Sequence, residues 1–256
     1  MFVDTHCHLD FYRFDADRAA VVARAVAAGV GRIVVPAISM ENVTAVLALA
    51  EQFTEVYAAV GIHPNSTAGW DDSWLESIRD LAQHEKVVAI GEIGLDYYWD
   101  KSPQAVQHHA FRQQLQLAAE LDLPVIVHNR EASADVVRML RQTPGKGVLH
   151  SFAADGDTAV QVLDMGYYLG FTGPVTYKKA AELRQIAAQT PLDRIVVETD
   201  APFLAPEVNH KRPSRNEPAF VTHVAERIAR EREMDTAVFA HHTTQNAARL
   251  FPKLKF

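Results

Sequence analysis

The sequence predicts an α/β fold, a single-domain (β/α)8 or TIM barrel with its functional site at the carboxyl ends of the strands. Eight short apolar runs rich in β-branched residues recur along the 256 residues, one per 32 residues (256/8), the size of a strand–helix unit. Amphipathic, Ala-rich stretches separate these runs. No linker rich in Pro, Gly or Ser and no block of charge divides the chain, so one domain is expected over residues 1–256.

The predicted strands are almost continuously apolar, as is typical of parallel strands buried on both faces of a sheet. An open, doubly wound sheet is the alternative, but eight units favour closure into a barrel. The first strand also lacks a G-x-G-x-x-G turn, which disfavours a dinucleotide-binding fold. In chain order the predicted strands are Phe2–Thr5, Arg32–Pro36, Val56–Gly61, Val87–Gly91, Pro124–His128, Gly147–His150, Tyr167–Phe171 and Arg194–Thr199.

The amphipathic stretches predict the helices that surround the barrel. Those between the strands are Asp15–Ala28, Glu41–Phe53, Ser73–His84, Pro103–Leu121, Ala132–Gln142 and Ala180–Gln189. Two further helical stretches follow the last strand, near Pro218–Arg230 and Thr236–Leu250.

The composition is that of a globular protein, with 48% hydrophobic and 22% charged residues, which excludes disordered, collagen-like and coiled-coil chains. A net charge of −7 argues against a protein that coats duplex DNA. The single cysteine, Cys7, cannot form an intramolecular disulfide, which is typical of a reducing compartment. No apolar run reaches the roughly 18 residues that a membrane-spanning helix needs. We therefore expect a cytoplasmic protein with no membrane partner.

Metal-competent side chains follow the predicted strands, where a barrel of this kind keeps its chemistry. His6 and His8 lie at i and i+2, so both imidazoles face one side of the first strand and offer two nitrogen ligands to one ion. Glu92 follows a buried strand, and a buried carboxylate must be paired with a cation. A salt bridge would satisfy Glu92, but beside the histidines a carboxylate bridging two metal ions is favoured.

Three further residues end apolar runs in the same way. His128 and His150 follow two successive strands, and each alone would more often be a hydrogen-bonded core histidine. Asp200 follows the eighth strand and is expected to be a metal ligand and the general base for a metal-activated water. Glu198 lies on the same face as Asp200 and is expected to support the ligands.

The loops beyond the strands carry candidate substrate-binding residues. Lys211, Arg212 and Arg215 fall within five residues and could hold phosphate oxygens, although a solvated charged loop is an equal alternative. Arg130 and His63 are expected at the same mouth, and so is the segment from Asp96 to Tyr98. Three aromatic residues near strand ends could stack on a base or pack in the core: Phe152, Phe171 and Phe203.

The order of these residues resembles the amidohydrolase-like metal-dependent hydrolases, and the local motifs resemble the TatD family of metal-dependent deoxyribonucleases. The motifs run through almost the whole chain: VDTHCHLD at 3–10, GEIGLDYY at 91–98, VHNR at 127–130, LHSF at 149–152, VETDAPFL at 197–204, RNEP at 215–218 and NAARLF at 246–251. The GEIGLD and ETDAP motifs are the most specific of these.

The resemblance implies a TIM barrel with one or two divalent ions that cleaves phosphodiester bonds of DNA, as a 3′-5′ exodeoxyribonuclease acting on single strands or ends. By the same resemblance, one ion would be held by His6, His8, Glu92 and Asp200, and the second by Glu92, His128 and His150. Mixed nitrogen and carboxylate ligands leave Mg²⁺, Mn²⁺ and Zn²⁺ open. The chain departs from the family pattern at Ser151, where Cys is frequent, and at Ser214 in a longer last loop, where Lys is usual.

Two alternatives remain at this stage. A hydrolase of the same architecture could act on an ester or amide, including an aminoacyl ester, but such enzymes commonly carry a bridging lysine, and here the fourth strand leads to Glu92. A non-catalytic protein would leave six metal-competent residues at strand ends unexplained. We expect DNA as substrate and no organic cofactor, and a monomer is the working hypothesis.

Overall fold

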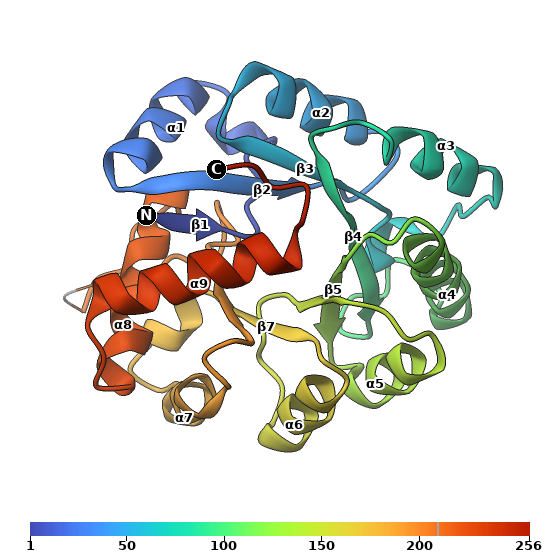
Figure 1. Cartoon of the computed structure of the whole chain (residues 1–256). Helices are drawn as coiled ribbons and strands as arrows, with labels where there is room; N and C mark the ends of the chain where they lie inside the picture. Colours follow the sequence, from blue (N-terminus) through green and yellow to red (C-terminus); the bar gives the residue numbers. More distant parts are fainter. Residues whose placement is uncertain (209) are drawn as a thin grey trace.

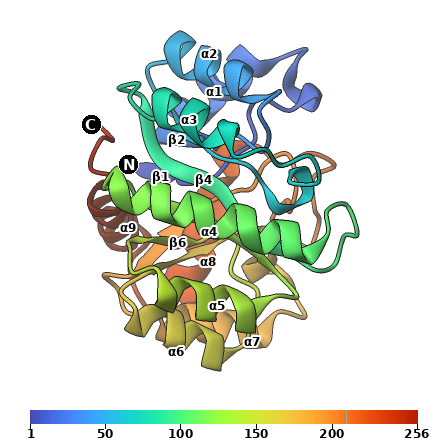
Figure 2. The same ribbon diagram turned by 90° about the vertical axis from the view of Figure 1, so that its right-hand side faces the viewer.

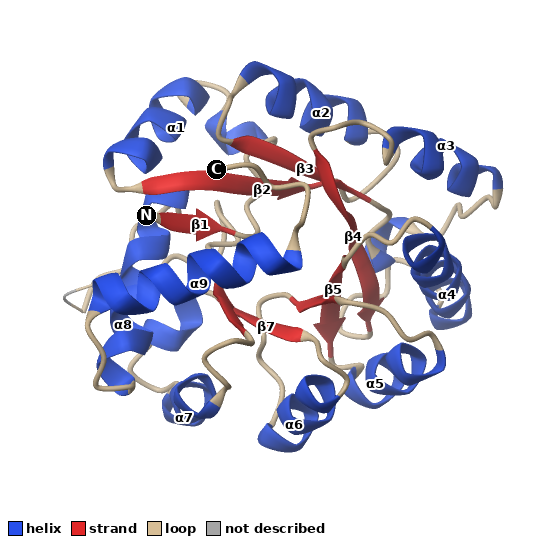
Figure 3. Ribbon diagram, in the orientation of Figure 1, coloured by secondary structure: helices blue, strands red, loops and turns tan. Residues whose placement is uncertain are grey.

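The eight apolar runs form one sheet of parallel strands that follow one another in chain order around a barrel, as the computed structural model of the chain shows (Figures 1 and 3). The structure describes residues 1–208 and 210–256. The predicted (β/α)8 barrel is thus confirmed. The strands are β1 (Phe2–Asp4), β2 (Val30–Pro36), β3 (Val56–Val60), β4 (Val87–Asp96), β5 (Val125–Arg130), β6 (Gly147–Leu149), β7 (Tyr168–Phe171) and β8 (Ile195–Val197).

Helices surround the strands on the outside (Figure 3). They are α1 (Arg18–Ala27), α2 (Val43–Gln52), α3 (Ser73–Leu81), α4 (Gln104–Glu120), α5 (Ser133–Gln142), α6 (Gly156–Asp164), α7 (Ala181–Gln189), α8 (Val221–Glu231) and α9 (Thr236–Leu250). The sequence patterns did not include α6. Its buried side chains, Thr158, Ala159 and Val162, are small, and the helix is marked instead by its N-cap, where the Asp155 side chain accepts a hydrogen bond from the Thr158 amide.

Every strand contributes at least one apolar side chain to the interior of the barrel. Val34, Ile126 and Val196 are examples. Helix α9 contributes Ala247, Leu250 and Phe251 to the same cluster. In Figures 1 and 2 this helix lies across one end of the barrel, so that end is plugged. The carboxyl ends of the strands, at the opposite end, are the part of the barrel left for a site.

Strand β4 runs further than predicted, to Asp96 instead of Gly91. Between the pairs Ile90–Val125 and Ile93–Val127, two residues of β4, Gly91 and Glu92, stand opposite the one residue Ile126 of β5, which is a β-bulge. The bulge includes Glu92, and bulges of this kind redirect side chains at functional sites. Glu92 therefore belongs to an irregular strand and does not follow a regular one.

Hydrogen bonds between the ends of β1 and β8 close the barrel. The buried Asp4 carboxylate accepts from the Thr199 amide at 2.8 Å and from the Thr199 hydroxyl at 2.6 Å, and the Asp200 amide donates to the His6 carbonyl at 2.9 Å. These contacts place the residues that follow both strands side by side. Along the described ranges, no helix is both long enough and apolar enough to cross a membrane.

Candidate metal centre

Seven metal-competent side chains meet at the carboxyl ends of the strands. They come from β1, β3, β4, β5, β6 and β8, or from the residues directly after these strands: His6, His8, His63, Glu92, His128, His150 and Asp200. All six residues expected as ligands are in this group. His63, expected as a substrate contact, lies among them with its Nε2 atom 3.5 Å from Glu92 Oε1.

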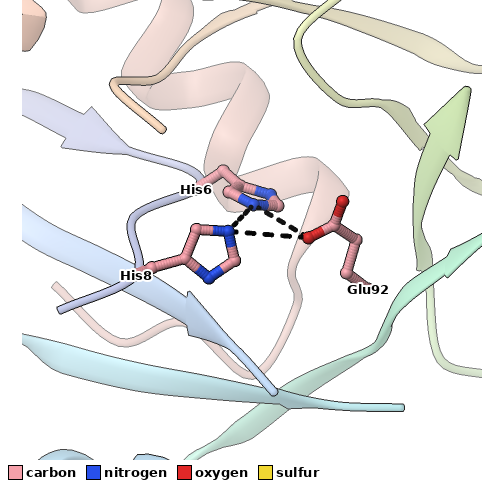
Figure 4. Close-up of side chains that lie close together, drawn as sticks. All are labelled: His6, His8 and Glu92. Atoms are coloured by element: carbon pink, nitrogen blue, oxygen red, sulfur yellow. Dashed lines mark hydrogen bonds and ion pairs between the residues drawn. The ribbon is translucent and has the colours of Figure 1, made fainter. Parts of the chain in front are cut away.

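The buried carboxylate of Glu92 stands at the middle of the group, and its Oε2 atom faces the first strand. His6 Nε2 lies 3.3 Å and His8 Nε2 3.7 Å from Oε2, and the two ring nitrogens are 3.2 Å apart (Figure 4). On the same side, Asp200 Oδ1 lies 3.4 Å from His8 Nε2 and 3.7 Å from His6 Nε2.

The other oxygen of the same carboxylate faces a second set of histidines. Glu92 Oε1 lies 2.8 Å from His128 Nδ1, 3.4 Å from His150 Nε2 and 3.5 Å from His63 Nε2. Each carboxylate oxygen thus has its own set of imidazoles, and the two oxygens point to separate positions.

This donor set fits divalent ions. Metal–ligand bonds of about 2.0–2.1 Å in a tetrahedral arrangement place neighbouring ligand atoms about 3.3–3.4 Å apart, close to most of the separations observed here. Imidazole nitrogen and carboxylate oxygen are donors that Zn²⁺ and Mn²⁺ accept. The residues present could therefore hold one ion on each side of Glu92.

Two further carboxylates orient the second set of histidines. Asp96 Oδ2 lies 3.1 Å from His128 Nε2 and 3.1 Å from Asn65 Nδ2, so its carboxylate is occupied by a histidine, where the sequence suggested a substrate contact. Glu198 Oε1 lies 3.2 Å from His150 Nδ1, which agrees with the supporting position expected for it. Such carboxylate–histidine pairs fix the imidazole tautomer and raise its basicity toward a metal.

Burial and mutual interactions shift the pKa values of the group. Burial raises the pKa of the Glu92 carboxyl, but the surrounding histidines, chiefly His150 and His63, outweigh it and hold the pKa well below its ordinary value. Burial likewise opposes ionisation of Asp200, whose pKa is nevertheless lowered by the hydrogen bond to His8. Both carboxyl groups are therefore ionised at neutral pH.

The pKa values of the histidines are shifted in two opposite directions. Burial lowers the pKa of His8, but its hydrogen bond to Asp200 outweighs burial and raises the pKa to about 9. The pKa of His128 is also raised to about 9, because Asp96 and Glu92 outweigh burial. Burial and the neighbouring His128 lower the pKa of His63 to about 3.

The expected substrate-binding arginines and lysine lie outside this cluster. The Arg215 guanidinium donates to Asp17 at 2.7 and 2.8 Å and to Glu217 at 2.8 Å, so it ties the last loop to the start of α1. Arg212 lies over the Tyr177 ring at 4.7 Å, and Lys211 is exposed. Arg130 is exposed at the end of β5.

Comparison with known proteins gives consistent matches over nearly the whole chain. The family model described as TatD related DNase matches residues 3–252. The metal-dependent hydrolase YabD of Bacillus subtilis is 43% identical, with 98% of this chain and 99% of YabD covered. The 3′-5′ ssDNA/RNA exonuclease TatD of Cronobacter sakazakii is 40% identical, with 94% of each chain covered. The crystal structure of YjjV, a TatD homologue from Escherichia coli, superposes with a TM-score of 0.91 at 36% identity and covers 98% of each chain.

Proposed function

Because the chain belongs to the family of TatD-related DNases, we propose that it removes nucleotides from single strands or ends of nucleic acid in the 3′–5′ direction. Family membership makes it a metal-dependent hydrolase. The exonuclease of Cronobacter sakazakii supports the substrate and the polarity, at 40% identity over 94% of the chain.

One observation carries the proposal: both oxygens of the buried Glu92 carboxylate face imidazoles, and each oxygen has its own set. We assign His6, His8, Asp200 and Glu92 Oε2 as the residues that would hold one divalent ion, and His128, His150 and Glu92 Oε1 as those that would hold a second. His63 Nδ1 accepts a hydrogen bond from the Asn65 amide at 3.0 Å, so its Nε2 atom carries the N–H and faces Glu92 Oε1 as a donor. Divalent ions held on the two sides of Glu92 would supply positive charge to the attacking and leaving oxygens of a phosphodiester.

Divalent ions bound there would activate water and neutralise charge on the phosphate. Asp200 is the residue that takes the proton of the attacking water, because its carboxyl is ionised at neutral pH. Its side chain is 14% exposed, against 3% for Glu92, so it is the more accessible of the two carboxylates in the cluster. Glu92 holds the two halves of the site together and takes no proton.

The oligomeric state, the domain organisation and the compartment are proposed from further features of the chain. All seven side chains of the cluster come from one copy of the protein, so we propose a monomer in which residues 1–256 form one domain. The single cysteine is buried and has no partner cysteine, which supports the cytoplasm as the compartment. No organic cofactor is required for this chemistry.

The test is cleavage of end-labelled single-stranded DNA by metal-stripped protein resupplied with Mg²⁺, Mn²⁺ or Zn²⁺. We expect a ladder that shortens from the 3′ end, and a loss of orders of magnitude in Asp200→Asn and Glu92→Gln. Asp157→Asn, at an exposed carboxylate of α6, is the matched control and should cleave normally. No cleavage with any metal, with turnover of an ester or amide panel instead, would reject the nuclease and leave a hydrolase of C–O or C–N bonds.

A further inference from the structure

Exposed aromatic rings are concentrated at the mouth of the barrel. Among the described residues, the aromatic side chains with large exposed fractions are Tyr12, Tyr98, Trp99, Phe203 and Phe256. All except Phe256 lie in the loops that follow β1, β4 and β8, on the side of the metal centre. Phe152 and Phe171, which could have faced a base, are instead buried in the core. Exposed apolar area that gathers beside a site is a mark of binding.

Two of these rings form a cluster with a cation. The rings of Tyr98 and Trp99 are 4.8 Å apart and nearly perpendicular, and they are 50% and 47% exposed. The guanidinium carbon of Arg130 lies 3.9 Å from the Tyr98 ring centre and 5.6 Å from that of Trp99. The Lys101 ammonium lies 5.7 Å from the Trp99 ring centre.

Arg130 differs from Arg215 in what holds it. Arg215 is bound by two carboxylates, whereas Arg130 has no carboxylate within 4 Å among the residues that the structure describes. Aromatic rings fix the direction of the Arg130 guanidinium and leave its N–H groups free. A planar, directed guanidinium with free donors is suited to phosphate oxygens.

The cluster is fixed to the metal centre by Asp96. Oδ1 of Asp96 accepts from the Tyr98 amide at 3.0 Å and from the Trp99 amide at 3.1 Å, while Oδ2 of the same carboxylate holds His128. Asp96 and Arg130 are also partners in the β4–β5 ladder. The rings and the guanidinium therefore keep a constant position relative to the candidate ligands.

We propose that Tyr98, Trp99 and Arg130 form a nucleotide subsite, in which a nucleobase stacks on the exposed rings while Arg130 binds a phosphate of the same strand. This proposal rests on the proposed function and adds the part of the substrate that is recognised. Every base has a π face, so the subsite accepts any sequence. Bases in a duplex are covered by their neighbours, so the subsite selects single strands or frayed ends.

The test compares two probes that differ only in their bases. One is a fluorescein-labelled, phosphorothioate-linked hexathymidylate, and the other is a hexamer of tetrahydrofuran abasic units with the same phosphorothioate linkages. Anisotropy is measured with the full-length, Mn²⁺-loaded protein. We expect the thymidylate to bind roughly 5- to 150-fold more tightly, the range for one stacked base. Trp99→Leu and Tyr98→Leu should each reduce this ratio toward one. Tyr98→Leu should also weaken the abasic probe, because the Tyr98 ring orients Arg130, whereas Trp99→Leu should affect that probe less.

Arg130→Ala should weaken both probes and reduce the slope of log affinity against log salt by about one, as expected for one lost phosphate contact. Phe256→Leu is the matched control, because that exposed ring also lies beneath an arginine, Arg32 at 5.7 Å, but far along the chain from the mouth. It should bind as the unmodified protein does.

An unchanged base-to-abasic ratio in Trp99→Leu and Tyr98→Leu, with normal metal content and circular dichroism, would overturn the subsite. Because the readout is binding, it separates the two proposals. If the protein prefers the thymidylate but cleaves no nucleic acid, the subsite is supported and the nuclease is rejected. If it cleaves nucleic acid normally but shows no base preference, the nuclease is supported and the subsite is rejected.

Discussion

Replacing Asp96 by Asn tests whether the orientation of His128 controls the second half of the metal centre. The change keeps the size of the side chain, and the Asn carbonyl can still accept from the Tyr98 and Trp99 amides. Its NH2 group, however, would replace the oxygen that lies 3.1 Å from His128 Nε2. A donor would then face His128, and Nε2 must become the acceptor.

The substitution should weaken metal binding by changing the tautomer of His128. With an ion bound, Nε2 would donate a hydrogen bond to Asp96, and Nδ1, which lies 2.8 Å from Glu92 Oε1, would offer its lone pair to the ion. In Asp96→Asn the neutral ring would carry its proton on Nδ1 and offer no lone pair to an ion. Loss of such a supporting carboxylate typically weakens metal binding 10- to 100-fold, which corresponds to about 1.4–2.7 kcal/mol.

Calorimetric titration of the metal-stripped protein with Mn²⁺ and Zn²⁺ measures this effect for each equivalent. One binding event should weaken 10- to 100-fold and the other should change little, because His6, His8 and Asp200 do not contact Asp96. Asp135→Asn is the matched control, since that carboxylate accepts from the Tyr97 hydroxyl at 2.6 Å, away from the ligands. Affinities within about threefold of the native protein for both equivalents would refute the role given to Asp96.

Four further predictions follow from the same geometry. Glu92→Gln should at least halve the metal bound per chain, measured by mass spectrometry of the metals, and full occupancy would contradict the bridging position. The pKa values of His8 and His128 are raised to about 9 from about 6.5 in the unfolded chain. Protonation of these histidines therefore stabilises the metal-free protein fully below pH 6.5, and this stabilisation is lost as the pH rises through 9. Tm in EDTA should fall between pH 6.5 and 9.5, and a flat profile would exclude the raised pKa values. Gly94→Ala should lower Tm by roughly 6–12 °C (about 3 kcal/mol), because Gly94 has φ +146° and an added Cβ would lie 2.0 Å from the His128 carbonyl oxygen, whereas Gly69→Ala meets nothing within 4 Å and should leave Tm unchanged. Arg215→Ala should speed tryptic cleavage after Lys211 without changing metal content, and an unchanged rate of cleavage at that bond would show that the Asp17 and Glu217 ion pairs do not hold the loop.

The barrel and the membership of the cluster could be predicted because both depend on simple periodicities. Buried parallel strands are continuous apolar runs, and each run ends where a polar residue must meet solvent or a ligand. His6, His128, His150 and Asp200 all follow this pattern, and parallel strands bring their carboxyl ends to one end of the barrel. No knowledge of distances was needed to group them.

The sequence could not show how the ligands divide between two positions. That division depends on the β-bulge at Glu92, where two residues of β4 stand opposite one of β5, and no local pattern marks an extra residue of this kind. His63 presented the same difficulty. It follows β3 as the other histidines follow their strands, but only the distance of 3.5 Å to Glu92 Oε1 shows that it belongs to the cluster.

The partners of the cationic side chains in the last loop could not be predicted for a different reason. Composition placed Lys211, Arg212 and Arg215 near the mouth, but it could not show that carboxylates would bind Arg215. Asp17, 198 residues before Arg215, binds its guanidinium through both oxygens. Arg130 stands alone in the sequence, and among the described residues its guanidinium lies against rings and has no carboxylate partner.

The two halves of the centre are unequal in their support, and this inequality indicates an order of metal binding. On the Oε1 side, His128 and His150 each have a buried carboxylate at 3.1 or 3.2 Å, which raises the basicity of both ligands. On the Oε2 side, the remaining nitrogen of His6, Nδ1, is buried without a hydrogen-bond partner among the described residues. The Oε1 side should therefore fill first, and the Oε2 side, which includes the more exposed Asp200, should exchange its ion more readily. The Oε2 side, which includes the proton acceptor Asp200, is thus the side whose occupancy should depend on metal concentration. Asp96→Asn should weaken the Oε1 side and so bring the metal affinities of the two sides closer together.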